Sequence, residues 1–388
     1  MKIKFGLLPR IILAILLGVA LGSFVPEIVV RYFATFNSLF GGFLGFAIPL
    51  IIIGFIVPGI AHLGKGAGKL LGITATTAYI STIIAGSLAF TVGTLLLPGF
   101  IENTTAGNVV NPGEALLSGL FELEIAPIMG VMTALIFSFV LGIGISSTNS
   151  TQLRTIMDEF QRIIEKLITY VIIPLLPLHI LGIFMNMTYG GQVQSILSVF
   201  AKVFIMIIAL HLTMLLLQYT IAGISSGKNP LHLLRTMLPA YFTALGTQSS
   251  AATIPVTLQS SKKTGVNEKV AEFAIPLFAT IHLSGSMITL VSCSMGVILL
   301  TGGSPTLSEM FPFILLLGVM MIAAPGVPGG AVMAAAGLLE TMLGFDPTMV
   351  SLMIALYLAQ DSFGTATNVT GDGALTVIVN KITGAKMA

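Results

Sequence analysis

The stretch SLFGGFLGFAIPLIIIGFIVPGIA, residues 38–61, contains no Asp, Glu, Lys or Arg. About 20 consecutive apolar residues form a helix long enough to cross the hydrocarbon core of a bilayer. Apolar residues make up 55% of the 388-residue chain and charged residues only 8%, whereas about a quarter of the residues of a soluble domain are charged. The composition therefore excludes a soluble fold and predicts an all-α polytopic membrane protein.

Seven other stretches are similar, which gives eight predicted spans: residues 11–31, 38–62, 70–98, 127–147, 168–187, 193–223, 267–300 and 348–384. Two further apolar segments, 236–261 and 312–342, are interrupted midway by Ser, Gly and Pro. We expect re-entrant hairpins there, the first entering from the cytoplasmic side and the second from outside. Irregular backbone at membrane depth persists only where it is buried in protein or lines a cavity. The two hairpin tips should therefore line the functional site.

The basic residues of the short loops predict the orientation of the chain. With the N-terminus inside, all Lys and Arg residues except Arg31 and Lys202, of 17 in total, fall on the cytoplasmic side. We therefore expect a protein of the cell inner (plasma) membrane with both termini in the cytoplasm. Residues 1–10 resemble the start of a signal peptide, but no small-residue cleavage site follows, so the first helix should be retained.

The remaining composition narrows the possible partners. The formal net charge of +2 gives no indication of nucleic acid, so the expected partners are membrane lipid and a small-molecule substrate. The single Cys293 lies in an apolar run and is interpreted as a small core residue, without a disulfide framework. His62, His179, His211 and His232 show no metal-ligand spacing, so we expect no transition-metal site.

Two carboxylates, Asp361 and Asp372, lie deep inside the span 348–384, and no Lys or Arg precedes Lys381 in that helix. A carboxylate at the bilayer centre costs at least about 2.5–3.5 kcal/mol, so each should face a cavity and have a partner. With about 100° of turn per residue, Asp361, Thr365, Asn368 and Asp372 form a polar stripe on one face. This stripe suits an amine or a metal cation. The alternative is a protonated Asp that is hydrogen-bonded to a neighbouring helix.

Glycines accompany this stripe, and they suggest a second feature of the helix. Gly364, Gly371 and Gly373 would permit local unwinding, which would free carbonyl groups for an alkali ion. We therefore expect the last span to be irregular near its polar stripe.

The two hairpin tips carry different chemistry. In the first, residues 246–255 gather small hydroxyl side chains where free backbone N–H groups could hold a carboxylate, as helix N-termini do. In the second, residues 324–330 read APGVPGG, which is unlikely to continue a helix, so this tip should expose carbonyl groups. The alternatives are close helix packing for the first tip and a passive turn for the second.

His282 lies within the span 267–300, beside Ser284, Gly285 and Ser286. A lone histidine in such a place is more often a hydrogen-bonded core residue than a ligand. An intramembrane hydrolase built from His282, an Asp and a Ser is conceivable, but no nucleophile motif supports it.

Four motifs in this chain resemble those of the dicarboxylate/amino acid:cation symporter family, the glutamate and neutral amino acid transporters. They are NVTGD at 368–372, SSAATIPVT at 249–257, GVPG at 326–329 and IPLFATI at 275–281, which is similar to the run ahead of the family's sodium motif. The resemblance covers essentially the full length, and the chain is identified as a divergent member.

The resemblance implies a secondary active symporter, not an enzyme, with an elevator-type transporter fold that assembles as a homotrimer. A fixed scaffold would consist of residues 1–69, helices 1 and 2, and 127–187, helices 4 and 5. A mobile transport domain would consist of helix 3, residues 70–98, and residues 193–388 with both hairpins. The mobile unit would carry the substrate across the membrane.

The resemblance also implies roles for the site residues. Asp361 would hold the substrate α-amine, and Asn368 would hold its α-carboxylate together with Ser249 and Ser250. Further pocket residues would be Gly364, Thr365, Val327, Pro328 and Gly329. Asp372 would bind Na⁺ with Asn368 beside an unwound seventh helix, and a second Na⁺ would be bound by the carbonyl groups of Thr280, Met321, Ile322 and Ala324.

Three departures from the family pattern alter these expectations. Acidic-substrate members carry Arg where this chain has Gly364, so a side-chain carboxylate would enter the cavity unpaired. The motif that usually reads Asn-Met-Asp-Gly-Thr is HLSGS at 282–286. Ala85 and Gly86 align with the family's Thr-Ser pair in helix 3. One sodium site is therefore expected to be missing, and His282 becomes a possible proton site.

These observations predict a symporter that couples a zwitterionic, neutral amino acid to Na⁺, H⁺ or both. Two alternatives remain open. One is a symporter for an organic solute without an amine, which would leave Asp361 for a proton or an ion. The other is a gated anion or water channel that uses the same interface. Accumulation of a solute against its gradient separates a symporter from a channel.

Overall fold

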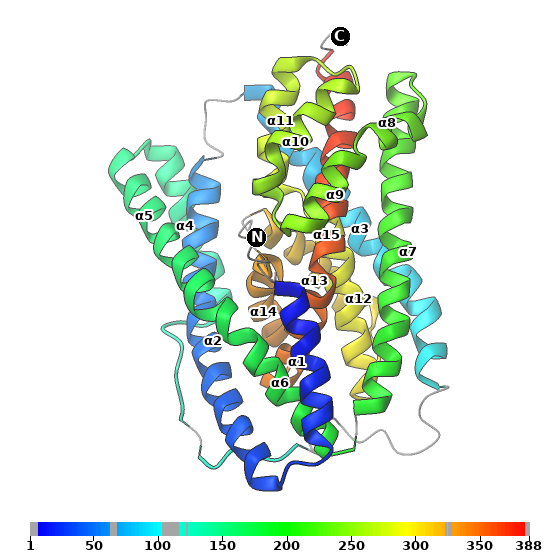
Figure 1. Cartoon of the computed structure of the whole chain (residues 1–388). Coiled ribbons are helices and arrows are strands. Elements are labelled where there is room, and N and C mark those ends of the chain that lie inside the picture. Colours follow the sequence, from blue (N-terminus) through cyan, green and yellow to red (C-terminus); the bar gives the residue numbers. More distant parts are fainter. Residues whose placement is uncertain are drawn as a thin grey trace, which may run out of the picture.

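The computed structural model describes residues 7–62, 68–102, 116–121, 123–191, 193–322, 324 and 328–384, and every regular element in these ranges is a helix (Figure 1). Within these ranges, six helices are long and apolar enough to cross a membrane, and three shorter apolar helices accompany them. The predicted all-α architecture is confirmed. The helices are α1 Leu7–Gly22, α2 Glu27–His62, α3 Gly68–Glu102, α4 Val131–Thr148, α5 Thr151–Leu167, the π-helical η1 Ile168–Ile172, α6 Ile173–Tyr189, α7 Val193–Ser226, α8 Pro230–Thr236, α9 Leu238–Thr247, α10 Ser250–Lys263, α11 Glu268–Ile281, α12 Ser284–Leu300, α13 Leu307–Met321, α14 Gly330–Leu343 and α15 Pro347–Ile382.

Three predicted boundaries in the first half of the chain are wrong, namely the end of the span 11–31 and the starts of the spans 38–62 and 168–187. The span predicted at 11–31 ends at Gly22, and α2 begins at Glu27, directly after Pro26. Proline lacks an N–H group and disfavours a helical residue before it, so the chain turns there. The span predicted at 168–187 begins earlier, because α5, η1 and α6 form one continuous helical segment from Thr151 to Tyr189.

The helices pack as two sets. α1 packs on α6, and α2 packs on α4, α5 and α6. α15 packs on α7, α9 and α12, and α12 also packs on α3. Figure 1 shows α15 in the middle of the molecule, with α2, α4 and α5 on one side and α3 and α7 on the other. α15 therefore lies where the residues of its polar stripe can meet several neighbouring elements.

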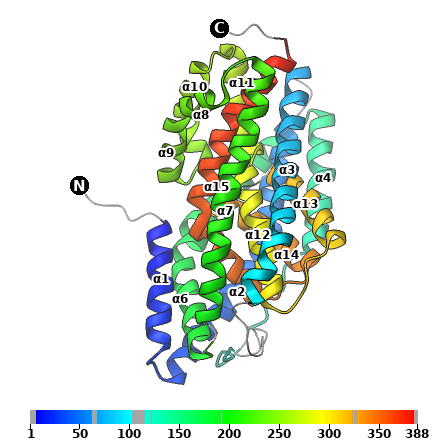
Figure 2. The ribbon, with the colours of Figure 1, turned by 90° about the vertical axis from the view of Figure 1, so that its right-hand side faces the viewer.

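Two helical hairpins form where the sequence predicts them. α9 and α10 join through Gln248 and Ser249, and Gln248 adopts a left-handed conformation with φ of 54°. α13 and α14 form the second hairpin, which covers the predicted segment 312–342 and begins five residues earlier, at Leu307. In Figures 1 and 2 the first hairpin lies toward the end of the molecule that holds the C-terminus, and α14 lies toward the opposite end. The hairpins thus reach α15 from opposite ends.

The span predicted at 267–300 is broken, whereas the last span is not. His282 and Leu283 separate α11 from α12, and His282 has extended backbone angles. The expected unwinding of the last span is wrong, because α15 is continuous from Pro347 to Ile382. Its glycines serve close packing instead: a Cβ atom on Gly371 would lie 2.6 Å from Gln218 Oε1, and one on Gly373 would lie 2.6 Å from Met237 Cε.

Candidate substrate and cation site

A cavity of about 20 Å³ lies where both hairpins and the α11–α12 break meet α15. Its lining residues are Gln248, Ser250, Ala279, Leu283, Ser286, Ala324, Ala331, Tyr357, Asp361, Thr365 and Asn368. This volume admits about one water molecule. A substrate as large as an amino acid therefore requires movement of at least one hairpin.

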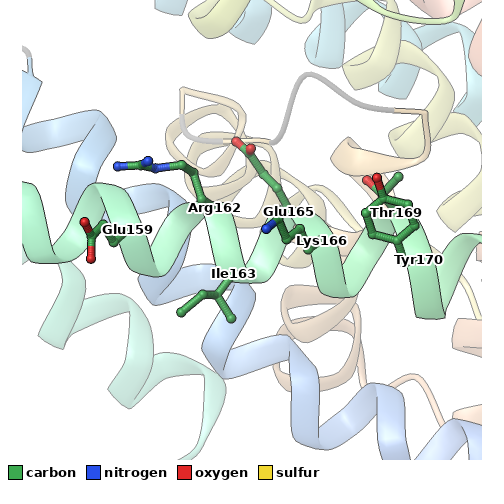
Figure 3. A pocket seen from close by; sticks show the side chains of 7 residues that line it. All are labelled: Glu159, Arg162, Ile163, Glu165, Lys166, Thr169 and Tyr170. Atoms are coloured by element: carbon green, nitrogen blue, oxygen red, sulfur yellow. The ribbon is translucent and has the colours of Figure 1, made fainter.

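A larger hollow lies on the outer face of the α5–η1 segment. It measures about 430 Å³, and its lining residues are Glu159, Arg162, Ile163, Glu165, Lys166, Thr169 and Tyr170 (Figure 3). All of these residues belong to one continuous helical segment, so among the described residues no second element lines this hollow. The smaller cavity at α15 is the better candidate.

Asp361 lines the cavity and is 5% exposed. The backbone N–H of Gly329 donates to its Oδ2 at 2.8 Å, and the Thr365 hydroxyl donates to its Oδ1 at 3.5 Å. Gly329 directly precedes α14, where unpaired N–H groups and the helix dipole favour a negative charge. The sequence predicts a partner for the buried carboxylate of Asp361, and a backbone N–H group of the second hairpin provides it.

The first hairpin brings the N-terminus of α10 to the same cavity. The Ser249 hydroxyl accepts a hydrogen bond from the Ala252 N–H at 3.3 Å and caps α10, while Ser250 lines the cavity. The Gln248 side-chain amide donates to Ser362 Oγ at 2.7 Å, which attaches the tip to α15. A helix N-terminus at this place suits an anionic group.

Asn368 connects α15 to the beginning of α12. Its Oδ1 accepts hydrogen bonds from the N–H groups of Gly285 at 2.7 Å and Ser286 at 3.3 Å, and its Nδ2 donates to Ser286 Oγ at 3.0 Å. Asn368 thus caps the helix that follows the break. Its Oδ1 faces N–H donors, so this oxygen is not directed toward a cation.

Asp372 and His282 form a completely buried pair beyond the cavity. His282 Nδ1 lies 2.8 Å from Asp372 Oδ1, and His282 Nε2 lies 3.1 Å from Ser81 Oγ. The Gln218 amide donates to Ser81 Oγ at 3.0 Å and to Ser284 Oγ at 3.3 Å. Because a carboxylate accepts, the proton is assigned to Nδ1, and Nε2 is the acceptor for neighbouring donors.

Unpaired oxygens remain around this pair. Asp372 Oδ2 and Gln218 Oε1 have no hydrogen-bond partner among the described residues. Another buried histidine, His211 on α7, also contacts the region of the break. Its Nε2 lies 3.0 Å from the Gly285 carbonyl oxygen. No group of three or more His, Cys, Asp or Glu side chains that could hold a metal occurs in the described part of the chain.

The residue of α3 that meets His282 is Ser81, which the sequence did not indicate. Ala85 and Gly86, one turn further along, lie elsewhere: a Cβ atom on Gly86 would be 2.7 Å from Ile314 Cγ2 and 3.1 Å from Met287 Cγ. Ser81 therefore places an α3 hydroxyl beside His282, although positions 85 and 86 carry no hydroxyl. Gln218 was not predicted as a site residue either, although a polar amide deep in the apolar span 193–223 indicates a buried hydrogen-bond partner.

The carbonyl groups predicted for a second Na⁺ lie at two helix C-termini. Ala279 near the end of α11 and Ala324 after α13 both line the cavity, so these two ends converge. Met321 and Ile322 close α13, and the exposed Thr280 donates its hydroxyl to the Leu277 carbonyl. Helix C-termini carry partial negative charge, which suits a cation.

The remaining predicted pocket residues divide into three cases. Pro328 and Gly329 belong to the turn before α14, and Gly329 reaches Asp361. Val327 lies outside the described residues. Gly364 is not in the cavity lining but packs on α12: a Cβ atom on Gly285 would lie 2.4 Å from the Gly364 carbonyl oxygen.

Comparison with known proteins places this geometry in context. The model of the "Sodium:dicarboxylate symporter family" matches residues 7–382. The serine/threonine transporter SstT of Acinetobacter baumannii (strain AYE) is 24% identical over 391 residues, which cover 97% of each chain. The protein of that name from Enterococcus faecalis (strain ATCC 700802 / V583) is 23% identical over 403 residues, covering 97% of this chain and 91% of the relative.

Proposed function

Because the chain belongs to the sodium:dicarboxylate symporter family, and its relatives are transporters rather than enzymes, we propose that it is a cation-coupled symporter for a small neutral amino acid. The observation that carries this proposal is Asp361, which is the one carboxylate among the described lining residues and accepts a hydrogen bond from the N–H group that precedes α14. The family assignment and the apolar helices make the chain a multi-pass membrane protein.

The cavity supports a zwitterionic substrate. The described part of its lining contains Asp361 but no Lys, Arg or His, so the negative charge meets no cationic side chain among these residues. A substrate ammonium group supplies that cation, and the N-terminus of α10 at Ser250 receives the α-carboxylate. The relatives are named as transporters of serine and threonine, amino acids whose side chains are uncharged, in agreement with this assignment.

Acidic substrates fit this cavity poorly. With Gly364 in place of the family's Arg, and no basic residue in the described part of the lining, a side-chain carboxylate would be buried without a partner. Truncating one partner of a buried ion pair is strongly destabilising, by about 3–5 kcal/mol. Aspartate and glutamate are therefore excluded from the proposed substrates, despite the dicarboxylate in the family's name.

Two positions support different coupling cations. The converging C-termini of α11 and α13 favour Na⁺ at the carbonyl groups of Met321 and Ile322. At Asp372, His282 donates to the carboxylate, and Asn368 Oδ1 is engaged by α12. We assign this second position to a proton, because an imidazole–carboxylate pair can take up and release one.

The assembly and the moving parts are also proposals. The packing of α1, α2 and α4–α6 separately from α3, α7 and α9–α12 supports a scaffold and a transport domain that carries α15. We propose that three copies form the homotrimer that the family resemblance implies, with both termini in the cytoplasm as the basic residues indicate.

A thermal-shift screen of the purified protein in detergent tests the substrate class. A ligand that binds the folded state raises the melting temperature, by mass action. Serine, threonine or alanine should raise it, more strongly with Na⁺ present, whereas aspartate and glutamate should not. Stabilisation by the dicarboxylates alone, or by organic solutes without an amine, would contradict the proposal and favour the alternative substrate class.

A further inference from the structure

Gln218 is a buried polar residue of the apolar helix α7, and it is 3% exposed. Its side-chain nitrogen, Nε2, lies 3.0 Å from Ser81 Oγ on α3, 3.3 Å from Ser284 Oγ at the start of α12 and 3.4 Å from His282 Nε2 at the break. One nitrogen thus meets three polar atoms from α3, from α12 and from the break itself. The side-chain amide of Gln218 therefore joins α7 to all of them.

The direction of these hydrogen bonds follows from Asp372. The carboxylate accepts from His282 Nδ1, so the imidazole proton lies on Nδ1, and Nε2 is an acceptor. Ser81 then donates its hydroxyl proton to Nε2, and Ser81 Oγ accepts from the Gln218 amide. Ser284 Oγ accepts the other amide proton. Both protons of the Gln218 amide are therefore directed at acceptors around the break.

α15 leaves room for this amide. A Cβ atom on Gly371 would lie 2.6 Å from Gln218 Oε1 and 3.1 Å from Gln218 Nε2, and it would also lie 3.0 Å from His282 Cε1. A side chain at position 371 would therefore push Gln218 and His282 away from α15. Gly371 directly precedes Asp372, so the amide of Gln218 is held next to the carboxylate that is expected to bind a cation.

The surroundings of Asp372 do not fit the Na⁺ that the family resemblance implies there. Asp372 Oδ1 accepts from His282, and Asn368 Oδ1 accepts from the N–H groups at the start of α12. An amide proton carries partial positive charge, so it attracts the same acceptors as a metal cation and repels the cation itself. The donors that converge on the break therefore satisfy acceptors that a bound Na⁺ would otherwise need.

We propose that the side-chain amide of Gln218 takes the place of a bound cation at the α11–α12 break and keeps Na⁺ from binding beside Asp372. Gln218 is a positioning residue, which acts through Ser81 and Ser284 and sets the number of Na⁺ ions that the protein binds. This inference rests on the proposed function, in which Na⁺ binds where the C-termini of α11 and α13 converge. The wild-type protein then binds one Na⁺, and a carboxylate at position 218 creates a second site.

The test follows the melting temperature of the purified protein in detergent as Na⁺ replaces choline at constant ionic strength. Gln218→Glu replaces the amide by a carboxylate of similar size, so a second Na⁺ should bind, and the slope of melting temperature against the logarithm of Na⁺ concentration should about double, by mass action. Gln360→Glu is the matched control. Gln360 is also 3% exposed, but its amide contacts Cys293 Sγ rather than the break, so the slope should keep its wild-type value.

Asp372→Asn tests the wild-type arrangement without adding a charge. Its side-chain oxygen can still accept from His282, and its slope should equal that of the wild type, because no Na⁺ binds at this position. A single symmetric peak in gel filtration shows that each variant is folded.

Three results would overturn the role of Gln218: equal slopes in the wild type and Gln218→Glu, an equally steep slope in Gln360→Glu, or a lower slope in Asp372→Asn than in the wild type. A wild-type melting temperature that does not respond to Na⁺ would instead contradict the proposed Na⁺ site at α11 and α13. In that case a Na⁺ response gained by Gln218→Glu alone would still support the inference about the break.

Discussion

His282 Nδ1 lies 2.8 Å from Asp372 Oδ1, and neither side chain is exposed. The pair lies at the break between α11 and α12, with Ser81 and Gln218 on the other side of the imidazole. A buried carboxylate is stable only with a partner, and here the partner is the imidazole of His282, which supplies a hydrogen-bond donor. Proton binding at this position would therefore be linked to the geometry of the break.

The first prediction concerns this pair. In His282→Ala, uptake driven by a proton gradient should be lost, because Asp372 keeps no side chain that can exchange a proton with it. The measurement is amino acid uptake into proteoliposomes with an imposed pH difference and equal Na⁺ concentrations on both sides. His232→Ala, which changes an exposed histidine on α8, is the control. Unchanged proton-driven uptake in His282→Ala would rule out this role.

The second prediction concerns the amine site. Asp361→Asn should abolish amino acid binding, because the amide can still accept from the Gly329 N–H but no longer attracts an ammonium group. Thermal shift with serine measures the loss. Asp346→Asn makes the same change at the N-cap of α15, where asparagine caps as well as aspartate, so its serine response should persist. Full binding by Asp361→Asn would contradict the assignment.

The third prediction concerns the contact between α12 and α15. Gly285→Ala would place a Cβ atom 2.4 Å from the Gly364 carbonyl oxygen, so the helices must separate. Overpacking of this kind typically costs about 1–3 kcal/mol, and we expect a lower melting temperature. Gly296→Ala is the control on the same helix, because its Cβ atom would lie 3.5 Å from Val203 Cγ2. Equal stability of the two variants would show that the close contact is unnecessary.

The fourth prediction concerns a contact between the two helix sets. His179 on α6 lies 3.0 Å from Ser351 Oγ on α15, through its Nε2. Either single substitution removes this hydrogen bond, so the double variant His179→Ala/Ser351→Ala should lose less free energy of unfolding than the sum of the two single losses. The coupling should be about 1 kcal/mol in a double-mutant cycle of unfolding. Additive losses would show that this bond contributes no coupling.

The fold was largely predictable because apolar runs, hairpin interruptions and the polar stripe are local features. The break at His282 was not visible as a gap in hydrophobicity, since both flanking helices belong to one apolar run, and only the family resemblance implied an unwound seventh helix. The continuity of α15 was mispredicted because glycine permits unwinding but also permits close packing, and only the neighbouring helices decide between the two.

The site was predictable to the extent that it lies on α15. Asp361, Thr365 and Asn368 line one cavity as the helical spacing indicates, whereas Asp372 lies with His282 beyond it. Tyr357 follows the same spacing and could have been included. Ser81 could not, because it is one of several hydroxyl residues on α3 and only the packing of that helix on α12 brings it to His282.

Concentrative uptake tests the central claim most directly. Proteoliposomes that contain the wild-type protein, with an inward cation gradient, should accumulate radiolabelled serine above the external concentration, and accumulation should collapse when an ionophore dissipates the gradient. Asp361→Asn should show no accumulation. Serine that only equilibrates across the membrane, at the same level with and without the gradient, would contradict symport and indicate a channel.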